Sequence, residues 1–219
     1  MKKLLLFLLV FSVTLLMSGC SKKESASNDS KDKTEKKSED KKDITFSENS
    51  TYHVKYDAKG DKVNGTMEMW IKGKNVKMDM NMDEKGKKVN SDMYFVDKIA
   101  YIVTDMEGKK MGMKMDISKE MEKGDDPTKD IVNIKEKLKD YQKLGTDEVL
   151  GYKCDVYQTK EGTKLSIYKE YFALKIVDKN NNTYVATAFE PDIKTADDFF
   201  TPPKDVEFMD MGNMKNMLK

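Results

Sequence analysis

Residues 66–82, with the sequence TMEMWIKGKNVKMDMNM, place methionine at alternate positions on either side of a Lys-Gly-Lys turn. Residues 111–115, with the sequence MGMKM, repeat the pattern. Alternate residues of a strand point to one face of a sheet, whereas a helix with 3.6 residues per turn distributes them around its circumference. The residues between the methionines are mostly polar. The pattern therefore predicts antiparallel strands with one thioether-lined face and one charged face.

Further strand signals run along the rest of the chain. Alternating apolar residues or short apolar runs are separated by turn residues rich in glycine, asparagine and aspartate. This spacing favours an antiparallel sheet of hairpins with about ten strands. The strands are expected at residues 52–56, 66–71, 76–82, 89–96, 99–104, 111–117, 152–159, 164–168, 172–177 and 183–189.

One helix is expected between the two groups of strands. Asp126 can cap it, Pro127 suits its first position and Gly145 suits its end. Its apolar stripe consists of Ile131, Ile134, Leu138 and Tyr141. Such a helix is ~24 Å long, whereas ten strands form a sheet roughly 45 Å wide. The predicted fold is therefore mainly β (α+β): a curled antiparallel sheet, or half-open β-barrel of about ten strands, with one helix across its concave face.

Residues 1–19 have the features of a signal peptide. Lys2 and Lys3 precede an apolar run over residues 4–16, which is shorter than the ~20 residues of a membrane span. The run ends in LMSGC at residues 16–20, which resembles the lipobox of bacterial lipoproteins. The resemblance implies that Cys20 is lipidated and becomes the mature N-terminus, which would anchor the protein to the membrane through its acyl chains. An ordinary secretory signal with an unrelated cysteine is the alternative.

The composition divides the remaining chain into three parts. Residues 20–43 are almost entirely charged or polar, so they are expected to form a disordered tether that begins at the lipidated cysteine. Residues 44–208 have the length of one domain, and residues 209–219 form a methionine-rich C-terminal tail. The formal net charge of +1 gives no indication of a nucleic-acid partner. Cys154 alternates in phase with apolar neighbours and is expected to be buried.

Three local patterns resemble the LolA/LolB-like superfamily, and more specifically its uncharacterised lipoprotein branch. They are MWIKG at residues 69–73, LGYKCDVY at 150–157 and DFFTPP at 198–203. The resemblance implies a half-barrel whose hollow binds acyl chains, in a protein of the bacterial cell envelope that is extracytoplasmic and lipid-anchored. The arginine that the best-understood carriers of this superfamily place in the hollow has no equivalent that we can identify in this chain.

The predicted function is the binding of a lipid or another hydrophobic ligand in a methionine-lined groove. The chain lacks a nucleophile elbow, a phosphate-binding glycine loop and a histidine/cysteine metal cluster, and its only histidine, His53, is expected at an exposed or edge position. We therefore expect neither an enzyme nor a cofactor. The candidate groove residues are Met67, Met69, Met78, Met80, Met82, Tyr101, Met111, Met113, Met115, Ile134 and Leu138.

Two other functions remain open. The protein would be an envelope interaction module without a ligand, in which the chain's own helix and tail fill the hollow of the sheet. Alternatively, the Met-x-Met pairs would bind Cu(I) or Ag(I), because thioethers are soft ligands. The candidate ligands for such a metal site are Met78, Met80, Met111 and Met113. No histidine or cysteine accompanies these methionines, which favours the hydrophobic use.

Overall fold

The computed structural model describes residues 44, 46–61, 63–84, 87–106, 108–118 and 134–211. The chain divides into two compact units, residues 1–42 and residues 43–219, and all described residues belong to the second. Among the described residues, no helix has the length and apolar character needed to cross a membrane. The predicted signal peptide, Cys20 and the tether lie outside the described residues, as does the tail from residue 212 onward.

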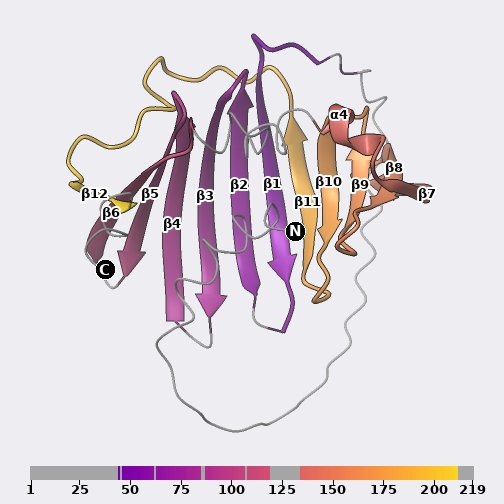
Figure 1. Ribbon diagram of the computed structural model, residues 1–219, viewed down its shortest axis with the longest axis horizontal. Helices are drawn as coiled ribbons and strands as arrows, with labels where there is room; N and C mark the ends of the chain where they lie inside the picture. Colours follow the sequence, from indigo (N-terminus) through magenta and orange to yellow (C-terminus); the bar gives the residue numbers. More distant parts are fainter. Residues whose placement is uncertain are drawn as a thin grey trace, which may run out of the picture. The chain divides into compact units, whose positions relative to one another are not determined.

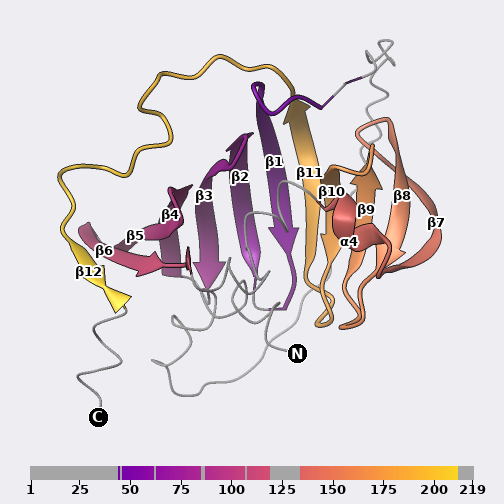
Figure 2. The same cartoon turned by 45° about the horizontal axis from the view of Figure 1, so that its top comes forward.

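The described residues form one sheet with the strand order β12-β6-β5-β4-β3-β2-β1-β11-β10-β9-β8-β7 (Figure 1). The sheet curls at both of its ends (Figure 2). This confirms the prediction of a mainly β fold with an open, curled sheet. The strands are β1 Thr51–Lys59, β2 Asn64–Lys72, β3 Asn75–Glu84, β4 Lys87–Val96, β5 Ile99–Met106, β6 Lys109–Asp116, β7 Gln142–Val149, β8 Tyr152–Gln158, β9 Lys164–Tyr168, β10 Phe172–Val177, β11 Thr183–Glu190 and β12 Phe208–Asp210.

The prediction of about ten strands is too low, because the described residues contain twelve. The two strands that were not predicted, β7 and β12, are the two edges of the sheet. Six of the eight residues of β7 are exposed, and β12 has only three residues. An edge strand packs on one neighbour only and needs little apolar sequence, so neither segment carries the alternation that marks the other strands.

The predicted helix is not confirmed as an element across the concave face. Helix α4 spans only Lys135–Leu138, and residues 119–133 lie outside the described part. Gly145 does not end this helix, because it lies inside strand β7. Ile134 and Leu138 are buried against Tyr157, Leu165 and Ile167 of β8 and β9. The described helix therefore lies at the β7–β10 end of the sheet, away from the methionine strands (Figure 1).

Strands β1–β6 and strands β7–β11 form two consecutive antiparallel meanders, which meet where β1 pairs with β11. We call this pairing the β1–β11 seam. One face of β1 at the seam is fully buried and consists of Tyr52, Val54, Tyr56 and Ala58. The Tyr56 hydroxyl donates a 2.8 Å hydrogen bond to the carbonyl oxygen of Ala173, next to a register shift in β10. This bond connects the two meanders across β11.

Candidate functional site

Methionines from neighbouring strands lie directly opposite one another on one face of the sheet. Met69 pairs with Met78, Met78 with Met93, and Met67 with Met80. Directly opposed residues share a face, as do alternate residues of one strand. We call the resulting surface the methionine face. It consists of Met67, Met69, Met78, Met80, Met82, Met93, Met111, Met113 and Met115.

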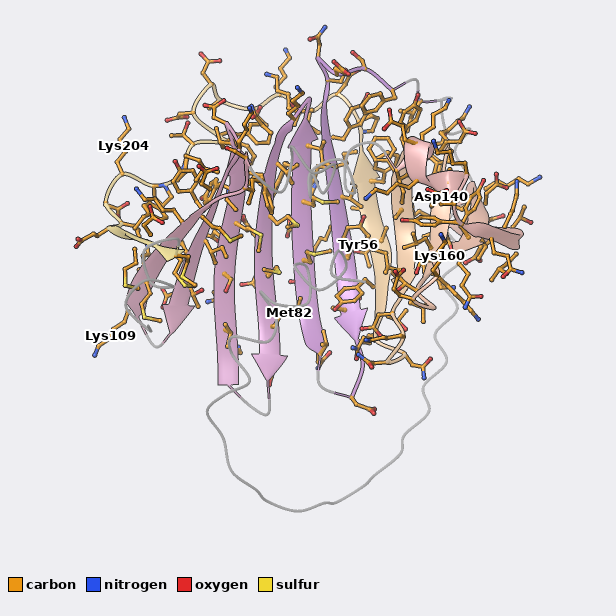
Figure 3. The ribbon with its side chains drawn as sticks, viewed as in Figure 1. Tyr56, Met82, Lys109, Asp140, Lys160 and Lys204 are labelled. Atoms are coloured by element: carbon orange, nitrogen blue, oxygen red, sulfur yellow. The ribbon has the colours of Figure 1, made fainter. Side chains whose placement is uncertain are left out.

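The strand pairing arranges this face as continuous rows across six strands. One row runs from Val54 of β1 through Met69, Met78, Met93 and Ile102 to Met113 of β6. A second row runs from Tyr56 through Met67, Met80, Ser91 and Thr104 to Met111. In Figure 3 the sulfur atoms gather over this half of the sheet, where Met82 is labelled.

The buried methionines of this face lie on β2, β3 and β4, whereas those of β6 are half-buried or exposed. Met78 in β3 is 1% exposed, and Met67, Met82 and Met93 are also buried. Met69, Met80, Met113 and Met115 are half-buried, and Met111 is 46% exposed. The face therefore combines a packed centre with side chains that solvent or a ligand can reach.

Two hydroxyl groups interrupt the second methionine row. Ser91 of β4 and Thr104 of β5 are directly opposed, and their side-chain oxygens are 3.3 Å apart. They lie between Met80 and Met111 in that row. Serine and threonine hydroxyls both donate and accept hydrogen bonds, so this pair supplies a polar point in an otherwise apolar stretch.

The structure places the predicted groove residues in three locations. The eight predicted methionines share one face, and Met93, which the prediction omitted, lies among them. Tyr101 lies on the opposite face, because it pairs with Tyr94 and Lys114, and Ile102 takes the position on the methionine face instead. Ile134 and Leu138 pack on β8 and β9. Only the methionines can therefore line a common site.

The four predicted metal ligands do not form one cluster. Met78 and Met80 belong to β3, whereas Met111 and Met113 belong to β6, and β4 and β5 lie between these strands. Three strand spacings correspond to roughly 14 Å. Within the described ranges, no group of three or more histidine, cysteine, aspartate or glutamate residues is arranged to hold a metal ion.

The opposite face of the sheet, which we call the outer face, carries a row of aromatic and charged side chains. The His53 ring stacks on Trp70 at a centroid distance of 4.8 Å, and its nitrogens lie 3.0 Å from Glu68 and 3.4 Å from Glu190. Trp70 also makes an edge contact with Phe199 of the loop that follows β11. His53 is thus half-buried under ring and carboxylate partners, which corrects its prediction as an exposed or edge residue. Trp70 lies on this outer face, as its phase in β2 indicates, and its contact with Phe199 places it under a loop.

The Lys77 ammonium group lies among three aromatic rings. Its nitrogen is 4.7 Å from the ring centroid of Phe199, 5.1 Å from that of Trp70 and 5.7 Å from that of Tyr94. It also forms an ion pair with Asp79 at 3.3 Å. Cation–π attraction of this kind stabilises by about 0.5–2 kcal/mol per contact, depending on exposure. Lys77 therefore fixes the loop at Phe199 against the outer face.

Asp79 is an unfavourably placed carboxylate on this face. Burial raises its pKa, the Lys77 ammonium opposes the shift, and Asp92, which lies directly opposite, adds to it. Its Oδ1 atom is buried and has no hydrogen-bond partner among the described residues. Because the raised pKa makes ionisation harder in the folded state, Asp79 lowers stability as the pH rises through its titration range.

We expect Asp79→Asn to stabilise the protein at pH 7 by about 0.2–1 kcal/mol, because it removes the charge that lies directly opposite the carboxylates of Asp92 and Glu68. The amide oxygen can still accept a hydrogen bond from Lys77. Urea unfolding of both proteins between pH 4 and pH 8 measures the difference, which should shrink as the pH falls and the native carboxyl becomes protonated. A variant that is less stable than the parent at pH 7 would contradict this account.

Cys154 is fully buried in β8, as its phase predicts. Burial raises the pKa of its thiol to about 11. The thiolate is the reactive form of cysteine, so this residue is inert at neutral pH and serves as a small packing residue.

The methionine face lies in the part of the chain that matches a known sequence family. The profile of a family described as "Domain of unknown function (DUF4412)" matches residues 53–169. These residues extend from β1 into the turn after β9 and include all nine residues of the methionine face. A comparison with curated proteins gives no match.

Two solved structures that match part of this chain belong to larger chains. A structure of PNGF-II matches 76% of this chain and 32% of its own length, with 12% identity and a TM-score of 0.43. The complex of Pseudomonas aeruginosa MucA and MucB matches 74% of this chain and 59% of its own length, with 11% identity and a TM-score of 0.44. The chain thus spans less than two thirds of either matched chain.

Proposed function

Because this chain belongs to the DUF4412 family, whose description assigns no function, we propose one from the methionine face: the protein binds an elongated apolar ligand, such as an acyl chain, at the cell envelope. One observation carries the proposal. Thioether side chains of β2, β3, β4 and β6 share one face of the sheet, and they range from buried to half-exposed positions.

Methionine suits such a ligand better than branched side chains do. It is unbranched, has three rotatable bonds and carries a polarizable sulfur, so a methionine surface adapts to apolar ligands of different shapes. A core that needed only to be filled would use leucine, isoleucine and valine, which have better-defined rotamers. The concentration of nine methionines on one face therefore favours an adaptable binding surface over simple packing.

The hydroxyls of Ser91 and Thr104 give the proposed site a polar point within the second row. They lie in the second row, one strand from Met80 on one side and one strand from Met111 on the other. Ligand sites commonly combine apolar walls with a few polar groups that fix orientation. In this proposal the two hydroxyls bind the head of the ligand, and the methionines of β2 and β3 contact its apolar tail.

The proposed location follows from the sequence at the N-terminus. The lipobox-like LMSGC at residues 16–20 and the polar segment after it support a lipid-anchored envelope protein on a charged tether. We expect Cys20→Ala to move the protein from the membrane fraction to the soluble fraction of its native cells, since the acyl chains supply nearly all of the membrane affinity. Fractionation after a carbonate wash tests this, and a Cys20→Ala protein that stays with the membrane would contradict the anchor.

We expect Met80→Lys to abolish binding of a fluorescent fatty acid to the chain carrying Cys20→Ala. Met80 lies directly opposite Met67 and Ser91, so an ammonium group there would have no carboxylate partner in its row. It would stand where the ligand tail is proposed to bind, and an unpaired buried charge is costly. Titration monitored by fluorescence gives the affinity, and the expected loss is at least tenfold.

The matched control is Asn81→Lys, which adds the same charge one residue later on the opposite face of β3, at an exposed position. It should bind the fatty acid like the parent. Thermal unfolding of both variants separates a blocked site from an unfolded protein. Absence of saturable binding by the folded parent would contradict the proposed function and favour a hollow that the chain itself fills.

A further inference from the structure

The exposed methionines of the described residues gather at one edge of the sheet. Three large hydrophobic side chains are exposed among the described residues: Met111 at 46%, Leu144 at 45% and Met209 at 52%. The two methionines lie on the neighbouring strands β6 and β12, whereas Leu144 lies on β7 at the other edge of the sheet. Met209 of β12 pairs directly with Met113 of β6, and Met111 lies two residues before Met113 on the same face. We call Met111, Met113 and Met209 the edge methionines.

The position of β12 depends on a close backbone approach at Gly112. A Cβ atom at this position would lie 2.6 Å from both the carbonyl oxygen of Glu207 and a methyl group of Val206. Phe208 is further held by an edge contact with Tyr101 at a centroid distance of 5.2 Å. Glycine at 112 and an aromatic pair therefore hold β12 alongside β6, which keeps Met209 beside Met113 (Figure 2).

An open pocket of about 300 Å³ lies at this edge, and Met111 and Met209 contribute to its lining. Asp205 and Glu207 line it as well, with Lys110 as the cation among its lining residues. Two carboxylates and one ammonium leave the pocket slightly negative, which favours a cation over an anion. The pocket therefore places two exposed methionines, Met111 and Met209, in a cation-attracting setting.

The spacing of the edge methionines allows their sulfurs to meet at one point. Neighbouring strands lie ≈ 4.8 Å apart, and residues two apart on a strand lie ~6.6 Å apart. Each methionine side chain has three rotatable bonds, so three sulfurs at such spacings can converge on one ion. Thioether sulfur is a soft ligand that selects Cu(I) over the hard cations preferred by carboxylates.

We propose that Met111, Met113 and Met209 form a three-thioether binding site for a soft monovalent cation, Cu(I) or Ag(I), at the β6–β12 edge. This site differs from the four-methionine set predicted from the sequence, because it excludes β3 and includes a strand that the sequence did not reveal. Met111 and Met113 also belong to the methionine face, but the proposed ligand contacts the methionines of β2 and β3 and the hydroxyls of Ser91 and Thr104, not β12.

The test is competition for Cu(I) between bicinchoninate and the full chain carrying Cys20→Ala, under anaerobic conditions with ascorbate. The Cys20→Ala change removes one of the two cysteines, and the other, Cys154, is fully buried. We expect the parent to withdraw one equivalent of Cu(I). We expect the double variant Met111→Leu, Met209→Leu to bind at least tenfold more weakly, since leucine keeps the apolar volume but removes the sulfur.

Two further variants make the outcome decisive. Met78→Leu with Met80→Leu removes two sulfurs from the centre of the methionine face and should leave Cu(I) affinity unchanged. Met214→Leu with Met217→Leu removes two sulfurs from the tail and should do the same. No withdrawal of Cu(I) by the parent, an unchanged affinity in the Met111/Met209 variant, or an equal loss in either of the other variants would overturn the proposal.

A second readout does not depend on affinity. Titration of Ag(I) into protein labelled at the methionine methyl carbons should shift the signals of Met111, Met113 and Met209 first, and the signals of the buried Met78 and Met93 should stay in place. Thermal unfolding of every variant shows whether the leucine substitutions preserve the fold. Shifts confined to other methionines would overturn the assignment of the site.

Discussion

Replacement of Tyr56 by alanine is expected to reduce the free energy of unfolding by about 3–5 kcal/mol, the range for removing a large aromatic side chain from a core. Tyr56 is 1% exposed, lies directly opposite Met67 and Ala186, and donates a hydrogen bond to Ala173. The substitution therefore leaves a cavity at the β1–β11 seam and removes the bond that connects the two meanders. Urea unfolding followed by fluorescence measures the loss.

Tyr56→Phe separates the two contributions. The ring still fills the core, but the Ala173 carbonyl loses its hydroxyl donor, which costs about 1–3 kcal/mol when the acceptor remains buried. Lys59→Ala at the exposed end of β1 is the control and should change stability by less than about 0.5 kcal/mol. A Tyr56→Phe variant as unstable as Tyr56→Ala would show that ring packing contributes little at this position.

The same hydroxyl gives the seam a dependence on alkaline pH. Burial raises the pKa of Tyr56 above its ordinary value of about 10. A group with a raised native pKa contributes stability that is fully present below the unfolded value and is lost as the pH rises through the native one. The parent should therefore lose stability above about pH 10 more steeply than Tyr56→Phe does.

Replacement of Trp70 by alanine is expected to cost about 2–3 kcal/mol, somewhat less than for a fully buried tryptophan, because Trp70 is half-buried. The ring contacts His53, Phe199 and the Lys77 ammonium group. Loss of these contacts should release the loop over residues 191–207, which crosses from β11 to β12 (Figure 1). Limited proteolysis should therefore cleave this loop faster in Trp70→Ala than in the parent.

Trp70→Phe is the matched control for the loop, since it keeps an aromatic ring between His53 and Lys77. It should show cleavage close to that of the parent. The loop has a second attachment, a 3.1 Å hydrogen bond from the backbone amide of Ile193 to the carbonyl oxygen of Thr51. Cleavage that stays at the parent's rate in Trp70→Ala would mean that such backbone contacts alone hold the loop.

The strands were predictable where apolar and polar residues alternate, and the face of a residue was predictable only there. Met78 and Met80 alternate with Asp79 and Asn81, so their common face follows directly from the sequence. Residues 99–104 are largely apolar, so the sequence does not show which of Tyr101 and Ile102 faces the methionines. The turn decides this: Asp97 and Lys98 both have positive φ, and the resulting two-residue hairpin pairs Met93 with Ile102.

The edges and the helix were less predictable for a different reason. Strands β7 and β12 each gain most of their stability from one neighbouring strand, and their side chains carry little of the apolar pattern that sequence analysis detects. The apolar residues Ile134 and Leu138 do mark a buried helical turn, but their spacing cannot show which part of the sheet they cover. That depends on contacts with Tyr157 and Leu165, which are distant in the sequence.

The joining of two meanders at one seam also determines how the chain must fold. Within each meander the strands pair with neighbours in sequence, so their contacts are local and form quickly. The seam instead joins distant segments, since the residues linked by the Tyr56–Ala173 bond are 117 positions apart. Closing so long a loop has a larger entropic cost, which makes formation of the seam the slow step. During synthesis, β1 therefore cannot pair with β11 until β11 has left the ribosome. Aggregation or chaperone binding can compete with folding during this interval.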